Sequence, residues 1–323
     1  MDISVIVVTY NQESTIGRTL DSILSQKTEA EYEIIIGDDC STDGTEAICR
    51  GYAERYPDKI KYLRRKENLG VVGNYFDCIS HSRGRYLADC AGDDFWVDNR
   101  KLQRQFEVLE SRPEVSLVAT RWRYYNESTA EVTREPSALP PGEYDGRELL
   151  IPVMNHTAWI HLCSALYRKE IIEKGLREHP EVFINPDFSC EDQQIILACC
   201  AAGSIVVLPD LTLYYSVGHE SISHRRDYAD RCKYSLRAFR QSEALSRHFG
   251  ISTAALADKH ARSIRHMNAL AFRSGQPRLM ETVRPLFQKY QIEPKLKDSL
   301  YLTLSKSRFV WKHSRKLLNK IHG

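Results

Sequence analysis

Two neighbouring carboxylates stand between an apolar stretch and two aromatic residues in the segment CAGDDFW, residues 90–96. Asp93 and Asp94 offer the oxygen ligands that Mg²⁺ and Mn²⁺ prefer, and such ions complete their coordination with phosphate oxygens and water. The alternative is a solvent-exposed turn that caps the helix expected over 99–111. The residue types alone favour neither hypothesis, because short acidic motifs often occur by chance.

A second acidic pair follows the apolar run EIIIG, residues 33–37. Asp39 could accept a hydrogen bond from a ribose hydroxyl or from a nucleobase, as acids in this position do in other doubly wound nucleotide sites. The alternative is an Asx turn that caps the next helix. We favour the capping role for Asp43, and the ligand role for Asp39 because Asp38 already leaves the strand.

A third acidic pair, Glu191 and Asp192, opens a helical segment in CEDQQIILACCAAG. The helix dipole favours acids at this position, so the residue types favour a capping role, with a general base on a rigid element as the alternative. His219 in YYSVGHESIS could bind a metal, contact a phosphate or be an ordinary loop histidine. For a lone histidine the ordinary loop residue is the default.

Predicted strands alternate with predicted helices over the first 120 residues, where two of these acidic pairs lie. Apolar runs predict strands over 3–8, 33–37, 60–63, 85–88 and 115–119. Helical spacing after Ser14 and over 43–56, 71–82 and 99–111 predicts the connections, with Asp43 and Glu46 in capping-box spacing. Alternation of this kind indicates right-handed βαβ units and a mostly parallel sheet, whose ligands gather at the carboxyl ends of the strands. The motifs VVTYNQE, GDDCSTDGT and GDDFW lie at these ends.

The second half of the chain predicts a different organisation. Residues 120–160 are rich in Pro, Glu and Tyr, which indicates a long surface excursion, and residues 155–192 are where we expect sugar selectivity to be decided. A strand leading into a helix, a second helix and two short strands follow up to about 224. From about 225 amphipathic helices are expected, with breaks near Gly250 and Pro277.

The charges are divided unevenly along the chain. Residues 225–323 hold 22 Lys and Arg against 7 Asp and Glu, whereas the whole protein has a net charge of only +2. The last 25 residues, 299–323, hold six basic and no acidic residues. Val310, Leu317, Leu318 and Ile321 can share a helix face there, with Phe309 and Trp311 beside it. This composition predicts a helix on an anionic membrane surface, with a core-packing amphipathic helix as the commoner alternative.

The composition, 42% hydrophobic and 27% charged, is that of an ordinary globular protein. The nine cysteines are odd in number and show no CxxC spacing, which favours buried thiols in a reducing cytoplasm over disulfides or a zinc site. No apolar run is long enough for a membrane span, and MDISVIVVTY predicts a strand rather than a signal peptide. A cytoplasmic protein, peripheral on the inner face of the plasma membrane, is the expected location.

Seven motifs in order resemble those of the family 2 glycosyltransferases, which have the GT-A nucleotide-sugar-binding fold. They are SVIVVTYNQE, IIIGDDCSTDGT, NLG with a following GN, GRYLADCAGDDFWVDNRKLQRQ, ALYRKEII, CEDQQI and YYSVGHESIS. The resemblance implies an α/β GT-A domain over 1–224, with a nucleotide-binding half at about 1–120 and an acceptor half at about 121–224. Residues 225–323 match no family motif and would form a basic helical extension.

The resemblance also implies a role for each matching residue. The nucleotide sugar would be bound by Val8 through its backbone and by Tyr10, Glu13, Asp39, Asn68, Gly70, Asn74 and Asp93. Asp94 would bind Mn²⁺ or Mg²⁺ at the diphosphate, and His219 would complete that site. Asp192 would be the general base, with Glu191 positioning it or the acceptor.

The mechanism implied is a single inverting displacement in which one sugar passes from a nucleoside-diphosphate sugar, UDP-sugar favoured, to a hydroxyl group. The acceptor would be a glycan or a lipid-linked acceptor in cell-surface polysaccharide or lipopolysaccharide assembly. One departure concerns the metal: many family members carry an acid where this chain has Ala91, which predicts weaker metal coordination. The Gln-x-x-Arg-Trp element of processive synthases is absent, so a single addition is expected.

Other functions are weighed by the motifs that they require. A nucleotidyltransferase would show a Gly-rich loop after the first strand and a dehydrogenase would show G-x-G-x-x-G there, whereas this chain has TYNQEST. No recognition motif supports a nucleic-acid partner. A non-catalytic sugar-nucleotide-binding or scaffold protein of the same fold remains the main alternative, because of Ala91.

Overall fold

The structure of the protein is a computed structural model that describes residues 1–134, 138–218, 227–307 and 309–314. The chain divides into two compact units. The first contains Met1–Pro186 and the described residues from Cys190 to the end of the sheet, and the second contains Asp187–Ser189 and the described residues from 227 onward. Among the described residues, no helix combines the length and the apolar character needed to cross a membrane.

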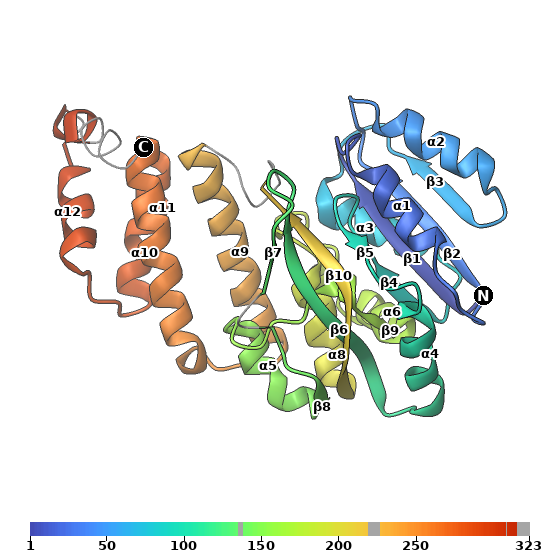
Figure 1. The fold of residues 1–323 in the computed structure, drawn as a ribbon. Helices are drawn as coiled ribbons and strands as arrows, with labels where there is room; N and C mark the ends of the chain where they lie inside the picture. Colours follow the sequence, from blue (N-terminus) through green and yellow to red (C-terminus); the bar gives the residue numbers. More distant parts are fainter. Residues whose placement is uncertain (135–137, 219–226, 308, 315–323) are drawn as a thin grey trace. The chain divides into compact units, whose positions relative to one another are not determined.

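A ten-stranded sheet runs through the first unit, counted over the described residues. The strand order is β3-β2-β1-β4-β9-β6-β10-β5, with β7 beside β6 and β8 beside β10 (Figure 1). The strands are β1 (Ile3–Thr9), β2 (Tyr32–Asp38), β3 (Ile60–Arg64), β4 (Tyr86–Asp89), β5 (Phe95–Trp96), β6 (Val115–Asn126), β7 (Val132–Thr133), β8 (Gly142–Tyr144), β9 (Leu166–Arg168) and β10 (Ser204–Val217). The strands β1 to β4 are parallel, as are β6 and β10, and in the described chain antiparallel pairing involves only β9 and the short strands β5, β7 and β8. The expected α/β class is therefore confirmed.

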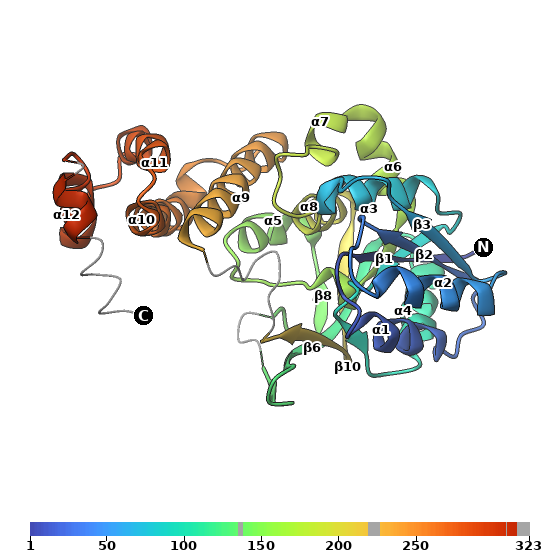
Figure 2. The same cartoon turned by 90° about the horizontal axis from the view of Figure 1, so that it is seen from above.

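Helices cover both faces of this sheet (Figure 2). They are α1 (Ile16–Leu24), α2 (Thr45–Arg55), α3 (Gly70–Ser80), α4 (Lys101–Ser111), α5 (Gly146–Met154), α6 (Lys169–Glu178), α7 (Pro180–Phe183) and α8 (Asp192–Ala202), with the 3₁₀ turn η1 (Leu162–Ser164). Figure 2 shows α1 and α2 on one side of β1 to β3 and α3 on the other. Right-handed crossovers produce this split, because the chain steps from β1 to β3 in one direction and returns from β3 to β4 in the other.

The parallel strands are buried on both faces, which explains their unbroken apolar sequences. Every residue of β2 is buried, and so are Ile3, Val5 and Val7 of β1. Because β1, β2 and β4 run parallel, their carboxyl ends meet at one edge of the sheet. That edge carries the loops that contain Tyr10, Asp39 and the segment CAGDDFW.

The structure corrects two expectations about the second half of the first unit. The predicted surface excursion over 120–160 contains the last part of β6, the strands β7 and β8, and α5. The two short strands expected after α8 are one 14-residue strand, β10, whose pairing with β6 shifts register between Val207 and Leu213. The sequence VLPDL at this point predicts a break, but the long neighbour β6 keeps β10 in the sheet across the irregularity.

The second unit is helical in its described part, as expected for the C-terminal region. It contains α9 (Tyr228–His248), α10 (Ala257–Ser274), α11 (Pro277–Lys289) and α12 (Leu296–Leu304), with the 3₁₀ turn η2 (Ala254–Leu256). The rings of Tyr301 and Trp311 both contact Phe272, and the indole Nε1 of Trp311 donates to the carbonyl oxygen of Phe272 at 2.9 Å. Trp311 is thus a core residue of this unit rather than part of an exposed apolar face.

Candidate active site

The loop CAGDDFW connects β4 to β5 and is held by one face of α1. Three residues of this face bond to three successive loop carbonyls: Thr15 to Gly92 (2.8 Å), Arg18 to Asp93 (3.2 Å) and Thr19 to Asp94 (2.6 Å). Residues three and four apart lie on the same side of a helix, so this spacing lets α1 bind the whole loop. A turn closed by the bond from Asp94 N to Ala91 O, 2.9 Å long, then aims the Asp94 side chain inward.

Asp94 is completely buried, which contradicts the alternative of a solvated capping turn. Its Oδ1 accepts from the backbone N–H of Ser216 at 2.9 Å, whereas its Oδ2 has no hydrogen-bond partner. Burial, with added repulsion from Asp93, raises the pKa of Asp94 well above its usual value. A buried carboxylate oxygen without a donor is costly unless a cation or a ligand supplies the missing partner.

Two residues that the sequence did not single out lie beside the Asp94 carboxylate. A ring nitrogen of His161, Sγ of Cys163 and a carboxylate oxygen of Asp94 lie within 4.8 Å of one another, and all three residues are buried. Burial lowers the pKa of His161 to about 4, so its imidazole is neutral near neutral pH and can act as a metal ligand. The two residues belong to the segment NHTAWIHLC, and no spacing within it links them to an acid 67 residues earlier.

Ala91 adjoins the same group. Its backbone N–H donates to Sγ of Cys163 at 3.4 Å. The Cys163 side chain therefore lies next to position 91, where many family members carry an acid and this chain has alanine. Asp93 is partly buried, and its backbone carbonyl is held by Arg18. The set of donors at this point is therefore mixed, with oxygen from Asp94, nitrogen from His161 and sulfur from Cys163.

Glu191 and Asp192 begin α8, as expected from the sequence. Glu191 is the N-cap residue by position, but its side chain makes no capping hydrogen bond, which differs from the role that the residue types favoured. Burial raises the pKa of Asp192 to about 6. Burial, with the neighbouring Asp192, raises the pKa of Glu191 as well. An acid with a pKa near 6 can accept a proton near neutral pH, as a general base requires.

The three acids act on one tyrosine of β10. Burial, with added repulsion from Asp94, Asp93 and Asp192, raises the pKa of Tyr215. Its ring lies 4.6 Å from that of His161, measured between ring centroids. The acids of the β4–β5 loop and of α8 therefore both act electrostatically on Tyr215, although they are about 100 residues apart in the sequence.

The residues expected at the nucleobase lie at the neighbouring strand ends. Tyr10 follows β1 and is 44% exposed, which leaves its ring available to a ligand. The carbonyl of Val8 accepts from Gly92 N at 3.0 Å, so its backbone ties β1 to the acidic loop. Asp39 accepts from Leu69 N at 2.7 Å, and burial raises its pKa. The Asx turn at this point is made by Asp38, whose Oδ1 accepts from Ser41 N at 2.9 Å.

Several predicted pocket residues instead hold the framework. Asn74 is buried, its amide nitrogen donates to Gly37 O at 2.7 Å and its amide oxygen accepts from Arg65 at 2.8 Å, so it joins α3 to β2. The carboxylate of Glu13 accepts from Gly44 N at 2.6 Å, at the start of α2. Both side chains therefore bond to the framework, and their direct contact with the nucleotide stays a prediction.

Asn68 and Gly70 form the connection into α3. The Asn68 amide donates to Asp39 O at 3.1 Å, and Gly70 has a φ of +75°, a conformation that favours glycine. The predicted capping box is absent in α2, because Glu46 pairs with Arg50 and Arg64 instead. His219, the remaining predicted metal residue, lies outside the described residues.

Comparison with known proteins places this site in a family. The family described as Glycosyl transferase family 2 matches residues 4–176, which is more than half of the 323 residues. The chain belongs to glycosyl transferase family 2. The matched part of this glycosyltransferase includes the strand ends β1, β2 and β4, the loop CAGDDFW, and the segment with His161 and Cys163.

Two relatives illustrate the range of similarity. An uncharacterised protein of Mycobacterium tuberculosis is 32% identical over 231 residues, which make up 72% of this glycosyltransferase and 63% of that protein. The succinoglycan biosynthesis protein ExoO of Rhizobium meliloti is 27% identical over 258 residues, or 76% of this chain and 69% of ExoO. The chain thus spans less than two thirds of the length of the mycobacterial relative.

Two solved structures share the fold. S. aureus TarS, solved with UDP-GlcNAc, superposes with a TM-score of 0.57 at 18% identity, covering 98% of this glycosyltransferase and 92% of the TarS chain. The mannosyltransferase PcManGT from Pyrobaculum calidifontis, solved with GDP-Man and Mn²⁺, gives 0.55 at 18% identity, covering 97% and 86%. The expected GT-A architecture is confirmed, and at this identity the likeness concerns the fold alone.

Proposed function

We propose that this glycosyltransferase transfers one sugar from a nucleoside-diphosphate sugar, UDP-sugar favoured, to a hydroxyl of a glycan or lipid-linked acceptor, with inversion at the anomeric carbon. The observation that carries the proposal is the buried, unpartnered Oδ2 of Asp94 in the same site as Asp192, whose pKa is raised to about 6. In the reaction Asp192 takes the proton of the acceptor hydroxyl. The acceptor oxygen bonds to the anomeric carbon, and the nucleoside diphosphate leaves from the opposite face.

Asp94 and His161 would hold the divalent cation, and the orphan oxygen of Asp94 fits that role. When bound, the cation would stabilise the charge that develops on the leaving diphosphate. An imidazole donor suits Mn²⁺ better than Mg²⁺, which prefers an all-oxygen shell. Burial raises the pKa of the Cys163 thiol, so this side chain stays protonated and would line the site rather than bind the ion. We therefore propose Mn²⁺ as the preferred ion, with His161 compensating for the acid missing at Ala91.

At the other end of the donor, Tyr10, Asp39 and the backbone of Val8 would hold the nucleobase and ribose. Asp93 would face the diphosphate and Glu191 would position the acceptor or Asp192. Asn74 and Glu13 would support the pocket indirectly, through α3 and α2. These roles divide residues 1–224 into two halves. The residues that would bind the nucleotide lie in the first half, at about 1–120, and those that would act on the acceptor lie in the second, at about 121–224.

The test is release of nucleoside diphosphate from a panel of sugar nucleotides with Mn²⁺. Wild type is compared with Asp94→Asn and Asp192→Asn, and with Asp58→Asn as a matched control at an exposed acid. We expect turnover of at least one donor, lost in the first two variants only. If the wild type binds nucleotide but turns over no donor, the alternative of a non-catalytic sugar-nucleotide-binding protein is correct.

The membrane partner remains a separate proposal for the basic tail, residues 299–323. Phe309 is 73% exposed and Val310 is 40% exposed, whereas Trp311 packs in the helical core. Leu317, Leu318 and Ile321 lie outside the described residues. Equal binding of anionic liposomes by the full chain and by a 1–298 truncation would exclude the tail as a membrane contact.

A further inference from the structure

Arg18 is a residue of α1 whose guanidinium group joins several segments of the first unit. Its Nη2 donates to the backbone carbonyl of Asp93 at 3.2 Å and to the hydroxyl of Ser216, in β10, at 3.3 Å. The same nitrogen pairs with Glu127, which directly follows β6, at 2.5 Å. Its Cζ lies 3.9 Å from the centroid of the Phe95 ring, a cation–π contact. The proposed reaction gives this arginine no role.

These contacts surround Asp94. Two of the contacted residues, Asp93 and Phe95, are its neighbours in the chain. The third, Ser216, donates its backbone N–H to Oδ1 of Asp94 at 2.9 Å. Arg18 therefore holds the residue before Asp94, the residue after it and the residue that bonds to its side chain. Each of these contacts acts on the carboxylate through its position, because none is made to the carboxylate itself.

Glu127 sets the orientation of the guanidinium group. Its two carboxylate oxygens accept from Nη2 at 2.5 Å and from Nη1 at 3.3 Å, so the pair is bidentate. The side chains of Arg18 and Glu127 are 34% and 22% exposed, so water screens their attraction only in part. The two hydrogens of Nη2 are shared among three acceptors. The short bond to Glu127 is the anchor, and the longer bonds to Asp93 and Ser216 depend on the orientation that it sets.

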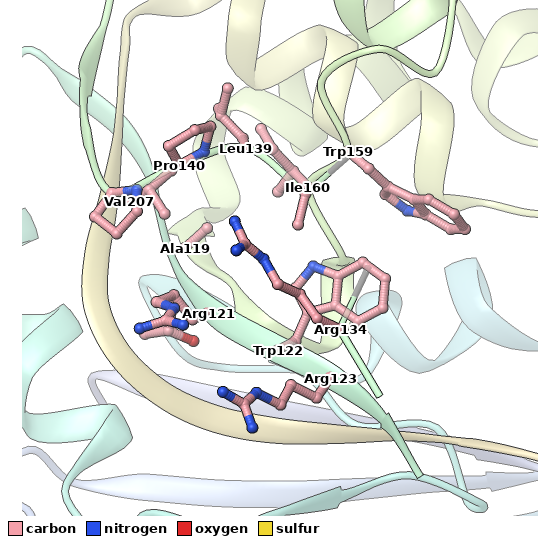
Figure 3. A pocket seen from close by; sticks show the side chains of 13 residues that line it. Ala119, Arg121, Trp122, Arg123, Arg134, Leu139, Pro140, Trp159, Ile160 and Val207 are labelled. Atoms are coloured by element: carbon pink, nitrogen blue, oxygen red, sulfur yellow. The ribbon is translucent and has the colours of Figure 1, made fainter. Parts of the chain in front are cut away.

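His161, the other proposed ligand of the cation, is positioned by aromatic packing. Its ring lies 5.0 Å from that of Trp122 and 4.6 Å from that of Tyr215, between centroids. Figure 3 shows the Trp122 side chain among the residues that line a pocket of about 140 Å³ beside β6. Packing of rings from β6 and β10 does not require a guanidinium group from α1. Loss of Arg18 should therefore disturb one proposed ligand and leave the other in place.

We propose that Arg18 is the positioning residue for Asp94 in the candidate cation site. One guanidinium group, oriented by Glu127, holds the chain on both sides of Asp94 and the strand end that bonds to its carboxylate. The second oxygen of Asp94 thereby keeps a fixed direction toward the place where a cation binds. The inference rests on the proposed function, of which the cation is a part, and adds to it a residue outside the acidic motifs.

Charge and position predict opposite effects when Arg18 is removed. A positive charge beside the site repels a cation, so Arg18→Gln would tighten Mn²⁺ binding if charge alone decided the affinity. If Arg18 positions Asp94, the same substitution weakens binding, because the carboxylate loses its fixed direction. We expect the Mn²⁺ affinity, measured by calorimetry without donor, to fall by about tenfold, the worth of one charge-assisted hydrogen bond. Binding should not vanish, because His161 stays in place.

Arg112 provides a matched control at the other end of β6. It precedes this strand, whereas Glu127 follows it. Its guanidinium group makes a bidentate pair with Glu143, and its side chain is also 34% exposed. Arg112→Gln should therefore lower the melting temperature by an amount similar to that in Arg18→Gln, but should leave the Mn²⁺ affinity unchanged. Equal losses of affinity in the two variants would show that Arg18 contributes only to stability.

Amide hydrogen exchange tests the positioning itself, without any metal. In Arg18→Gln the bond from Ser216 N to Asp94 should open more often, so exchange of the Ser216 amide, followed by NMR, should become about tenfold faster. Arg18→Lys keeps the charge but lacks the planar fork, so it should also speed this exchange. Arg112→Gln should exchange as the wild type does. If the Arg18 variants match the wild type in exchange and in Mn²⁺ affinity, or bind Mn²⁺ more tightly, the inference is wrong.

The two proposals can fail independently. Faster exchange at Ser216 in Arg18→Gln, in a protein that binds no Mn²⁺ and turns over no donor, would refute only the proposed function. Release of nucleoside diphosphate by a protein in which Arg18→Gln changes neither exchange nor Mn²⁺ affinity would refute only the positioning role of Arg18.

Discussion

At the scale of single residues, burial and charge conflict strongly at Asp94. Asp94→Asn removes the charge but keeps the shape of the side chain and its bond from Ser216 N. We expect at least a hundredfold loss of nucleoside diphosphate release, the order found when an electrostatic contact in an active site is removed, because Asn binds a divalent cation poorly. Mn²⁺ affinity, measured by calorimetry, should fall as well. An active variant with unchanged Mn²⁺ affinity would contradict the proposed metal site.

His161 and Cys163 provide a test of the mixed donor set. His161→Ala should weaken Mn²⁺ binding more than Mg²⁺ binding, because the lost donor is an imidazole nitrogen. Cys163→Ser should change the two affinities alike, because burial keeps this thiol protonated. Calorimetric titration of both ions into each variant measures the ratio. Equal losses for the two ions in His161→Ala would show that His161 supports the site only by packing.

The pKa of Asp192 predicts a pH dependence. The group must be ionised to accept a proton, and its pKa is about 6. The value of kcat/KM should therefore be level above pH 6 and should fall by about tenfold for each unit below it. Asp192→Asn should lose this acid limb and about 10²- to 10⁴-fold in rate. An acid limb that persists in the variant would assign the titration to another group.

At the scale of elements, the acidic loop depends on a glycine that packs tightly against β1. A Cβ on Gly92 would lie 2.4 Å from Gln12 Oε1, 2.8 Å from Thr9 Oγ1 and 2.9 Å from Thr9 Cβ. Gly92→Ala should therefore shift the loop, lower the free energy of unfolding by about 1–3 kcal/mol and reduce turnover. Gly51→Ala in α2 is the matched control, because nothing lies within 4 Å of its Cβ, and it should stabilise the protein slightly. Thermal unfolding and donor turnover of both variants decide the matter.

The elements of the nucleotide-binding half follow from local patterns. The unbroken apolar run at 33–37 becomes part of a strand buried on both faces, and the spacing of Ile16, Leu20 and Ile23 becomes the buried face of α1. The sequence does not predict β10 as one strand, because its middle, VLPDL, has local signals for a turn. Its continuity is decided by the neighbouring strand β6, which lies about 90 residues earlier and could not be recognised from local sequence.

At the scale of the whole molecule, stability should depend on pH through Asp89. This residue is buried at the end of β4, it accepts from the Tyr167 hydroxyl at 2.8 Å, and burial raises its pKa to about 7. Because folding favours the protonated form, its contribution to the free energy of unfolding is fully present below the unfolded pKa of about 4 and is lost as the pH rises through about 7. Asp89→Asn should flatten this fall between about pH 4 and pH 7 in urea denaturation. Parallel profiles for variant and wild type would contradict it.

What the sequence by itself determined is the fold class, the order of the strands and helices in the first 120 residues, and the family. These depend on short-range periodicity and on motifs that each lie within a few residues. Only the tertiary structure decided that Asp94 is fully buried with a free oxygen, that His161 and Cys163 lie beside it, and that Asn74 and Glu13 hold the framework. Burial and the meeting of distant side chains are set by how the strands pack, and no local pattern of residues encodes them.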